Sequence, residues 1–395
     1  MDDLRLAWRT FDGDDYRRVR QLGIRSVVTA LYDVSCDQVW PLDRLEALEE
    51  RIEAAGCRFE VVESLPVADE IILGGPAAEA LTEIWCRSLE NIRKVGVKRV
   101  TYNWMLGPDW CRTHWLTLPD GSETLAFDEA ATQSDAAIKQ LPGWLKNLDD
   151  AEFRQRLDQY RQVGADQLWD GLAKFLARVV PVAEGLEVKL ALHPDDPPWP
   201  VFGIPRIITD AAALDRVLGF QDSPANGLCF CTGSLGANPE NDLPAMVRRF
   251  GSRILFAHVR NVIRTGPRAF YESPHHQGDL ELGEILAAFY DAGFCGPMRP
   301  DHGHRIWDEQ NERPGYSWVT RAIGAAYLRG IWETLANDAS KGRRRPSRPM
   351  TADEGEPGLR AVKENLPLIP FDEPETSIRH QLLDRTLWHC CPPQK

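Results

Sequence analysis

Residues 298–304 read MRPDHGH, which places one carboxylate and two imidazoles directly after a short run typical of a buried strand. Three earlier runs of this kind also end on a residue that can bind a metal: LALHPDD (190–196), LCFCTG (228–233) and ILFAH (254–258). In α/β folds the carboxyl ends of parallel strands form the ligand-binding edge. The four strand ends therefore predict one shared site.

Strands and helices alternate along most of the chain. Short apolar or β-branched runs predict strands at residues 4–11, 26–31, 59–63, 97–103, 187–193, 227–231, 253–258 and 296–301. Helical spacing of apolar residues predicts helices at 15–22, 41–55, 76–95, 166–184, 209–219, 242–250, 280–292 and 316–336. Eight such repeats predict an α/β fold, a closed (β/α)₈ TIM barrel spanning about residues 1–339.

The alternation is interrupted after the fourth strand, over about residues 104–165. This stretch contains Gly-Pro (107–108), PDGS (119–122), Pro-Gly (142–143) and two polar helical pieces. A long excursion from a regular α/β pattern is typical of an active-site cover. We expect such an insertion here, and the alternative is a plain surface elaboration.

The composition changes again after about residue 339. Residues 341–349 read KGRRRPSRP, a basic linker that contains proline, and the remainder to Lys395 is rich in Pro and Glu. We expect residues 340–395 to form an extended C-terminal tail that wraps the barrel or a neighbouring subunit. A nucleic-acid-binding arm is the less favoured interpretation, because an acidic segment follows the arginines.

Charge and cysteine content limit the possible functions. The formal net charge of −13 argues against nucleic-acid or membrane partners, which require a basic surface. The net charge does not exclude an anionic small-molecule substrate, since one Arg can dominate the electrostatic field inside a pocket. The nine cysteines are irregularly spaced, which disfavours a disulfide framework. No signal peptide is recognisable and no apolar run approaches the ~18–20 residues needed to span a bilayer, so we expect a cytoplasmic protein.

Four residues at the ends of strands five to eight predict a mononuclear metal site: His193, Cys231, His258 and Asp301. Two neutral imidazoles, one thiolate and one carboxylate give a divalent cation two compensating charges. This mixed set favours Mn, Fe or Zn over Mg or Ca. Cys229 is an alternative to Cys231, because strand alternation puts both on one side, but Cys231 is nearer the carboxyl end.

The residues beside the predicted ligands are candidates for orienting them. Of His302 and His304, one could orient a ligand and the other could face the substrate as a proton carrier. Asp195 and Asp196 precede two prolines and are either turn formers or hydrogen-bond partners that hold His193.

Further candidates lie on other strand ends and on the last helix. Arg260 is a candidate contact for a substrate carboxylate, although an Arg at a barrel rim is often only an ion-pair partner. Asn103, which ends the fourth strand, and His304 are the other candidate substrate contacts. Tyr316 begins the last helix, where a tyrosine is usually a packing residue.

A series of short motifs occurs in a characteristic order. They are VVTAL (27–31), VVES (61–64), LPDGS (118–122), HPDDPP (193–198), GIPRI (203–207), ANG (225–227), CTGS (231–234), NDL (241–243), HVR (258–260), MRPDHGH (298–304) and PGYS (314–317). Together they resemble the mannonate dehydratase family of hexuronate degradation, a barrel related to the xylose isomerase-like group. The resemblance runs from about residue 5 to 335.

The resemblance implies an activity and a cofactor. It implies dehydration of D-mannonate to 2-keto-3-deoxy-D-gluconate and water, by C2 proton abstraction and loss of the C3 hydroxyl. It implies one Mn²⁺ or Fe²⁺ ion per subunit, held by the four residues chosen above on their chemistry. His302 and Tyr316 resemble the acid/base pair, and the sequence does not assign the two roles. We also expect a homo-oligomer, a dimer or tetramer, with a small sugar acid as substrate.

One departure from the family pattern leaves alternatives open. After residues 30–31 the family typically carries a His pair, whereas this chain has Tyr32 and Asp33. The change predicts either a preference for a different sugar acid or weak activity. A sugar isomerase of the same barrel group is a second hypothesis, which the Cys ligand disfavours because such isomerases hold metal with carboxylates. A non-catalytic metal-binding relative is the third.

Overall fold

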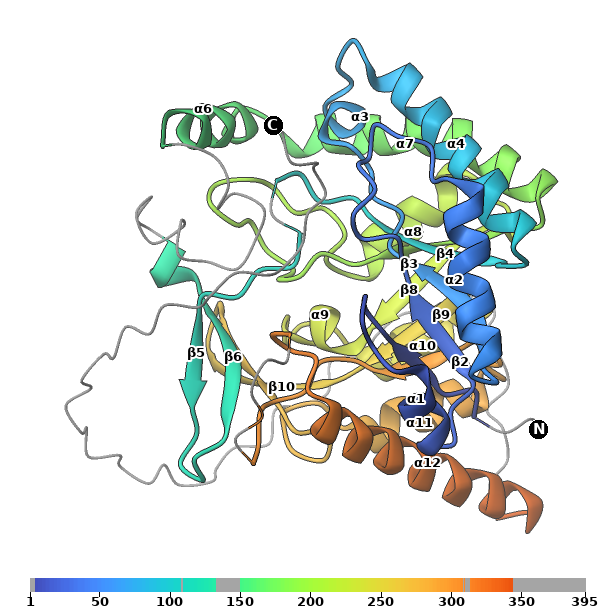
Figure 1. The fold of residues 1–395 in the computed structure, drawn as a ribbon. Coiled ribbons are helices and arrows are strands. Elements are labelled where there is room, and N and C mark those ends of the chain that lie inside the picture. The colour runs from blue at the N-terminus through green and yellow to red at the C-terminus, as the bar shows by residue number, and fades with distance from the viewer. Residues whose placement is uncertain (1–3, 108, 133–149, 308, 310–312, 344–395) are drawn as a thin grey trace.

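A barrel of eight parallel strands forms the centre of the computed structural model, which describes residues 4–107, 109–132, 150–307, 309 and 313–343 (Figure 1). In spatial order the strands are β1 (Ala7–Arg9), β2 (Ser26–Thr29), β3 (Arg58–Glu63), β4 (Arg99–Asn103), β7 (Lys189–His193), β8 (Asn226–Cys231), β9 (Ile254–Val259) and β12 (Met298–Pro300). The backbone N–H of Met298 donates to the carbonyl of Arg5 at 2.9 Å, which joins the last strand to the first. The predicted TIM barrel is confirmed.

Helices surround the strands. They are α1 (Tyr16–Gln21), α2 (Leu42–Ala54), α3 (Asp69–Leu73), α4 (Ala78–Lys94), α7 (Ala165–Gly185), α8 (Ala211–Phe220), α9 (Thr232–Gly236), α10 (Leu243–Phe250), α11 (Leu282–Asp291) and α12 (Trp318–Ser340). Each predicted helix is present, and α3 and α9 are additional short turns. Aspartate capping residues define where two of these helices begin. The side chain of Asp210 accepts a hydrogen bond from the backbone N–H of Ala213 in α8, and the side chain of Asp242 accepts one from the backbone N–H of Ala245 in α10.

Strand alternation divides the apolar side chains between two cores. Ala191, Cys229 and Phe256 belong to a small cluster inside the barrel, whereas Phe230 faces outward and packs on Phe289 of α11 at a ring-centroid distance of 5.7 Å. Strands covered on both faces read as nearly continuous apolar runs, which explains why they were recognisable in the sequence. The strand predicted at residues 4–11 is shorter, because Phe11 N already donates to Asp14 in a turn.

A second, antiparallel sheet lies beside the barrel and was not predicted. Its order is β10 (Asn261–Gly266), β11 (Ala269–Ser273), β6 (Glu123–Asp128) and β5 (His114–Thr117). We call it the accessory sheet; its β5–β6 hairpin stands at the left of Figure 1. The insertion was expected to contain two polar helical pieces. One of them is α6 (Asp150–Arg161); the structure adds a hairpin before α6, and the partner hairpin of the sheet follows β9.

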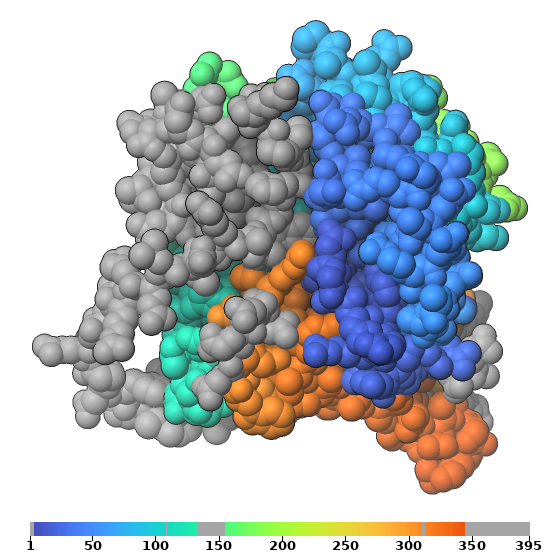
Figure 2. Space-filling model, in the orientation of Figure 1, coloured from blue at the N-terminus to red at the C-terminus, as the bar shows by residue number. Residues whose placement is uncertain are grey.

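The first strand and the last helix of the barrel also pack together on its outside. Trp8 of β1 packs on Trp318 of α12 with ring centroids 5.0 Å apart, and Figure 2 shows α12 in orange next to the blue N-terminal elements.

Helix α12 ends at Ser340. Residues 344–395 lie outside the described residues, so the division into a barrel and a tail stays a prediction. Among the described helices, none combines the length and apolar character required to cross a bilayer.

Candidate metal centre and active site

A small cavity of about 30 Å³ lies at the carboxyl ends of the barrel strands. Its wall includes residues from the ends of β1, β3, β4, β7, β9 and β12, and also Trp110 and Tyr316. This is the face at which TIM barrels place catalytic groups. Of the predicted site residues, the cavity wall contains Asn103, His193, His258, Asp301, His302 and Tyr316.

Three of the four predicted ligands come together at this end of the barrel. The ligand atoms of His193, Cys231 and His258 all lie within 4.8 Å of one another. Nδ1 of His193 is 2.7 Å from the carbonyl oxygen of Pro194, which fixes that nitrogen as the donor and leaves Nε2 as the acceptor. Cys229 lies in the barrel interior instead.

The chemistry of this group fits a transition-metal ion. Nε2 of His258 is buried and forms no hydrogen bond, although a Glu63 oxygen lies 3.3 Å away. A buried polar atom without a partner is destabilising unless a ligand takes it. Ser234 donates its hydroxyl hydrogen to Cys231 Sγ at 3.0 Å, a contact that suits a thiolate. Two imidazoles and one thiolate are ligands that Mn, Fe or Zn accept.

Asp301 lies beside the three-residue group. Its Oδ2 is 3.6 Å from Cys231 Sγ and accepts from Arg260 Nε at 2.9 Å, while Oδ1 is 2.6 Å from Arg299 Nη1. Burial would raise the pKa of Asp301, but Arg299 and the other nearby cationic groups hold it well below its usual value. The carboxylate is therefore ionised, as a metal ligand must be. Its role as fourth ligand stays a prediction.

Arg260 is fully buried in ion pairs. Its Nη2 donates to Asp196 at 2.7 Å and its Nε donates to Asp301. Arg260 is not among the described residues that line the cavity, and neither is His304, which is buried nearby. The structure thus displays the ion-pair arrangement that the sequence left as an alternative for Arg260. Asp195 accepts from the backbone N–H groups of Ile207 and Ile208.

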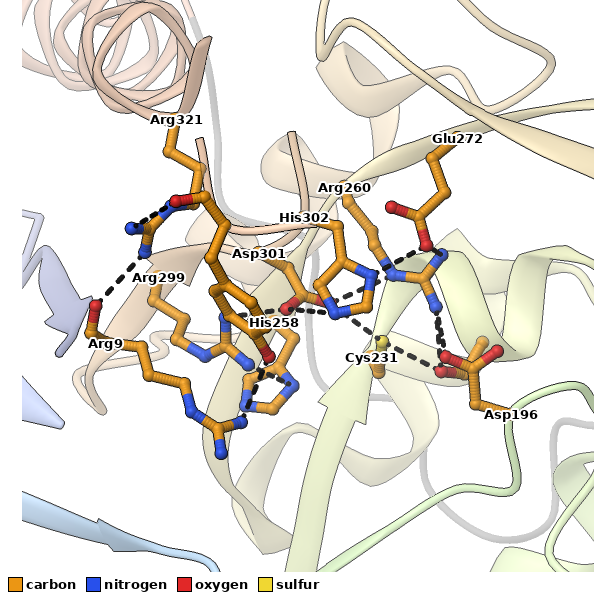
Figure 3. A network of polar contacts seen from close by, with 12 residues as sticks. Arg9, Asp196, Cys231, His258, Arg260, Glu272, Arg299, Asp301, His302 and Arg321 are labelled. Atoms are coloured by element: carbon orange, nitrogen blue, oxygen red, sulfur yellow. Dashed lines mark hydrogen bonds and ion pairs between the residues drawn. The ribbon is translucent and has the colours of Figure 1, made fainter. Parts of the chain in front are cut away.

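His302 projects into the centre of the polar network drawn in Figure 3. Its Nδ1 lies 2.7 Å from Oε1 of Glu272, a residue of the accessory sheet that the sequence analysis did not identify. The ring packs against Trp110 at 5.0 Å and Tyr316 at 5.1 Å between centroids. The imidazole is therefore fixed in position on the cavity wall.

Tyr316 is a functional candidate because its hydroxyl meets a cation at the cavity. Arg9 Nη1 donates to the Tyr316 oxygen at 3.1 Å. Burial raises the pKa of Tyr316 to about 12, with Arg9 and Arg299 opposing part of the rise. The phenol is thus protonated at neutral pH and available as a proton donor.

Glu63 and its arginine partners are cavity residues that the sequence analysis missed. Glu63 Oε1 accepts from Arg9 Nη1 at 2.6 Å, and Arg299 bonds both carboxylate oxygens, at 2.8 and 3.1 Å. Burial would raise the pKa of Glu63, but Arg299 and Arg9 lower it well below its usual value. The available signal was position: Glu63 ends the predicted third strand, and TIM barrels place catalytic residues at the carboxyl ends of their strands.

Asp109 and Trp110 were also missed, because they lie in the loop after β4. Asn103 Nδ2 donates to both oxygens of Asp109, at 2.7 and 2.8 Å. Burial raises the pKa of Asp109, with the nearby His193 opposing the rise. The beginning of the insertion therefore forms part of the cavity wall, as an active-site cover requires.

The departure at Tyr32 and Asp33 lies behind the cavity wall. The Tyr32 hydroxyl donates to the Thr10 carbonyl at 2.9 Å, and its ring packs on Phe11 at 5.2 Å. Asp33 points outward and pairs with Arg44 at 2.7 Å. Tyr32 thus supports the strand end that carries Arg9 and is not itself among the described lining residues.

Comparisons with known proteins agree on one family. Residues 3–342 match the family model described as D-mannonate dehydratase (UxuA). Mannonate dehydratase 2 of Halalkalibacterium halodurans is 42% identical over 346 residues, which cover 85% of this chain and 100% of that relative. The crystal structure of mannonate dehydratase from Streptococcus suis serotype2 superposes with a TM-score of 0.77 at 35% identity, covering 90% of this chain and 100% of the other.

A more distant likeness concerns the fold alone. A xylose isomerase-like TIM barrel protein from Mycobacterium smegmatis gives a TM-score of 0.50 at 15% identity, covering 81% of this chain and 87% of that one.

Proposed function

The chain belongs to the D-mannonate dehydratase (UxuA) family, and on this premise we propose that it removes water from D-mannonate to give 2-keto-3-deoxy-D-gluconate. The enzyme is then a carbon–oxygen hydro-lyase. The observation that carries the proposal is the meeting of the His193, Cys231 and His258 ligand atoms with His302 and Tyr316 at one end of the barrel. A small polar acid is the kind of substrate that such a wall of charged side chains binds.

We propose that His193, Cys231, His258 and Asp301 hold one Mn²⁺ or Fe²⁺ ion per subunit. The support is the donor set, the buried Nε2 of His258 without a hydrogen bond, and the ionised Asp301 next to Cys231. When bound, such an ion supplies Lewis-acid stabilisation of the negative charge that develops as the substrate loses its C2 proton.

His302 is assigned as the general base. A carboxylate on Nδ1 keeps the proton on that nitrogen, so Nε2 carries the lone pair that takes the C2 proton of the substrate. The electron pair of the broken C2–H bond forms the C2–C3 double bond. The resulting enol tautomerises to the ketone after the C3 hydroxyl has left.

Tyr316 is assigned as the general acid. Its phenol, protonated because burial raises its pKa to about 12, gives its proton to the C3 hydroxyl, which leaves as water. The N–H of Arg9 that bonds the Tyr316 oxygen stabilises the phenolate that this step creates. The two assignments place base and acid on rings 5.1 Å apart.

The setting of the enzyme is part of the proposal. We propose a homo-oligomer, a dimer or tetramer, that works in the cytoplasm. Free thiols at Cys36, Cys57, Cys86 and Cys111 suit a reducing compartment. Light scattering on the full chain gives the subunit count directly.

The function is tested by supplying D-mannonate, D-gluconate and D-xylose separately to the purified holoenzyme. The expected product is a 2-keto-3-deoxy acid from D-mannonate. Conversion of D-xylose to a ketose, with D-mannonate unchanged, would instead support the isomerase hypothesis. Metal retention without turnover of any of the three would support the non-catalytic alternative.

A further inference from the structure

Glu272 is a buried carboxylate outside the barrel that reaches the predicted catalytic base. It lies on β11 of the accessory sheet, and both its side chain and that of His302 are almost completely buried. Oε1 of Glu272 is 2.7 Å from His302 Nδ1. Figure 3 shows Glu272 and Arg260 on one side of the His302 ring, and Arg9 and Arg299 on the other.

Two buried arginines keep Glu272 ionised. Arg112 approaches Oε1 with Nε at 2.9 Å and Nη2 at 2.6 Å, and Arg260 Nη1 lies 3.6 Å away. Burial would raise the pKa of Glu272, but His302, Arg112 and Arg260 lower it below its usual value. An ionised carboxylate can only accept hydrogen bonds. The His302 nitrogen that faces it must therefore carry the hydrogen.

Packing leaves the His302 ring little freedom to turn away from Glu272. Gly315 lies against the ring so closely that a Cβ at that position would be 3.1 Å from His302 Cγ. The rings of Trp110 and Tyr316 pack against the His302 ring, with centroids 5.0 and 5.1 Å away. With Nδ1 bound to Glu272, Nε2 is the remaining nitrogen, and it lies 3.8 Å from Asp301 Oδ1.

We propose that Glu272 is a positioning residue of the dehydration reaction: it holds His302 as the Nδ1–H tautomer, so that the Nε2 lone pair faces the substrate. The inference rests on the proposed role of His302 as base. A carboxylate behind an imidazole also sets the tautomer and orientation in hydrolase triads, without touching the substrate. Glu272 touches His302 and the two arginines in the same way.

The arrangement gives the accessory sheet a role in catalysis. β11 pairs with β10 and with β6, so the position of Glu272 depends on both hairpins. Arg112 comes from the segment between β4 and β5, and it bridges Glu272 to Asp196 at 2.9 Å. The barrel thus supplies the base, and the insertions supply the group that orients it.

The matched test compares Glu272→Gln with Thr124→Val. Thr124 donates its hydroxyl hydrogen to the backbone carbonyl of Glu272, so its loss disturbs the same strand without touching the carboxylate. We expect Glu272→Gln to lower kcat on D-mannonate by about 10²-fold or more, while KM changes by less than about 3-fold and the metal content is unchanged. Thr124→Val should keep kcat within about 3-fold of the wild type. Equal losses in the two variants, or unchanged kcat in Glu272→Gln, would overturn the inference.

A second measurement is independent of turnover. ¹⁵N-histidine NMR of the wild-type protein loaded with diamagnetic Zn²⁺ reports which His302 nitrogen carries hydrogen, with His302→Gln used to assign the signals. The inference expects an Nδ1–H signal and an unprotonated Nε2. An Nε2–H tautomer in the wild type contradicts it. If the wild type made no product from any sugar acid, the proposed function would be wrong. The NMR signal would still show which tautomer His302 adopts, so the two failures can be distinguished.

Discussion

Arg9 Nη1 lies 3.1 Å from the hydroxyl oxygen of Tyr316, which joins the end of the first barrel strand to the start of the last helix. The same Arg9 nitrogen is 2.6 Å from Glu63, and the Tyr316 ring packs on Phe11 at 4.8 Å. The proposed acid is therefore held by two residues from the end of β1, and Arg9 links it to Glu63 at the end of β3. This relationship leads to the first two predictions.

Removing the Tyr316 hydroxyl should impair chemistry and leave binding nearly intact. We expect Tyr316→Phe to lower kcat on D-mannonate by about 10²- to 10⁴-fold, the usual contribution of a positioned general acid. KM should change little, because the aromatic contacts with Phe11 and His302 remain. Steady-state kinetics at saturating metal measures both parameters. An unchanged kcat would exclude Tyr316 as the acid.

The buried phenol should make stability depend on pH above 10. Burial raises the pKa of Tyr316 from its ordinary value of 10.0 to about 12, so the unfolded chain loses this proton first. Its contribution to stability is complete below pH 10 and is lost as the pH rises from about 10 to 12, by about 1.4 kcal/mol per pH unit. Urea unfolding of the wild type and Tyr316→Phe across this range should show the steeper decline in the wild type. Parallel declines would contradict the prediction.

Cys231 and Cys229 offer a matched test of the thiolate ligand. Both are fully buried on β8, but only Cys231 belongs to the group with His193 and His258. Cys231→Ser should weaken metal binding by at least about 10²-fold, because loss of even an outer contact typically weakens it 10- to 100-fold. Cys229→Ser should retain the metal. Elemental analysis after dialysis against a graded chelator measures the affinities, and equal metal loss in both variants would count against Cys231.

Glu63 should be a major contributor to stability. Glu63→Gln removes the negative charge that Arg9 and Arg299 share, and breaking such a buried ion pair costs about 3–5 kcal/mol. The control is Glu83→Gln, whose partner Arg178 is half exposed, and it should cost less than about 1 kcal/mol. Chemical denaturation measures the free energy of unfolding for each variant. Similar small losses in both would mean that the buried cluster is not stabilised by Glu63.

The barrel was predictable because its signal is local. Each barrel strand is short and buried on both faces, and each helix repeats its apolar residues every three or four positions, as α4 does with Trp85, Leu89 and Ile92. The accessory sheet carries no such signal. β5 contains no fully buried residue, and β6 pairs with β11 from a distant part of the sequence. Only the folded chain brings these segments together.

The candidate site likewise contains residues that the strand pattern predicted and residues that it did not. His193, Cys231 and His258 end successive strands of one sheet, so the strand pattern alone placed them next to each other, and the structure brings their ligand atoms together. Glu272 and Arg112 come from outside the repeat pattern, and their contact with the site follows from sheet packing. Arg260 was recognised as a candidate, but residue type and position could not show whether its partner was a substrate or Asp196.

Reconstitution of the metal-stripped enzyme shows whether turnover depends on an ion held by the predicted ligands. The full chain, freed of metal, is supplied separately with Mn²⁺, Fe²⁺, Zn²⁺ and Mg²⁺, and the 2-keto-3-deoxy product from D-mannonate is measured beside His193→Ala. We expect Mn²⁺ or Fe²⁺ to restore turnover in the wild type and His193→Ala to stay inactive with every ion. Full turnover by the metal-free enzyme, or equal turnover by His193→Ala, would contradict this expectation.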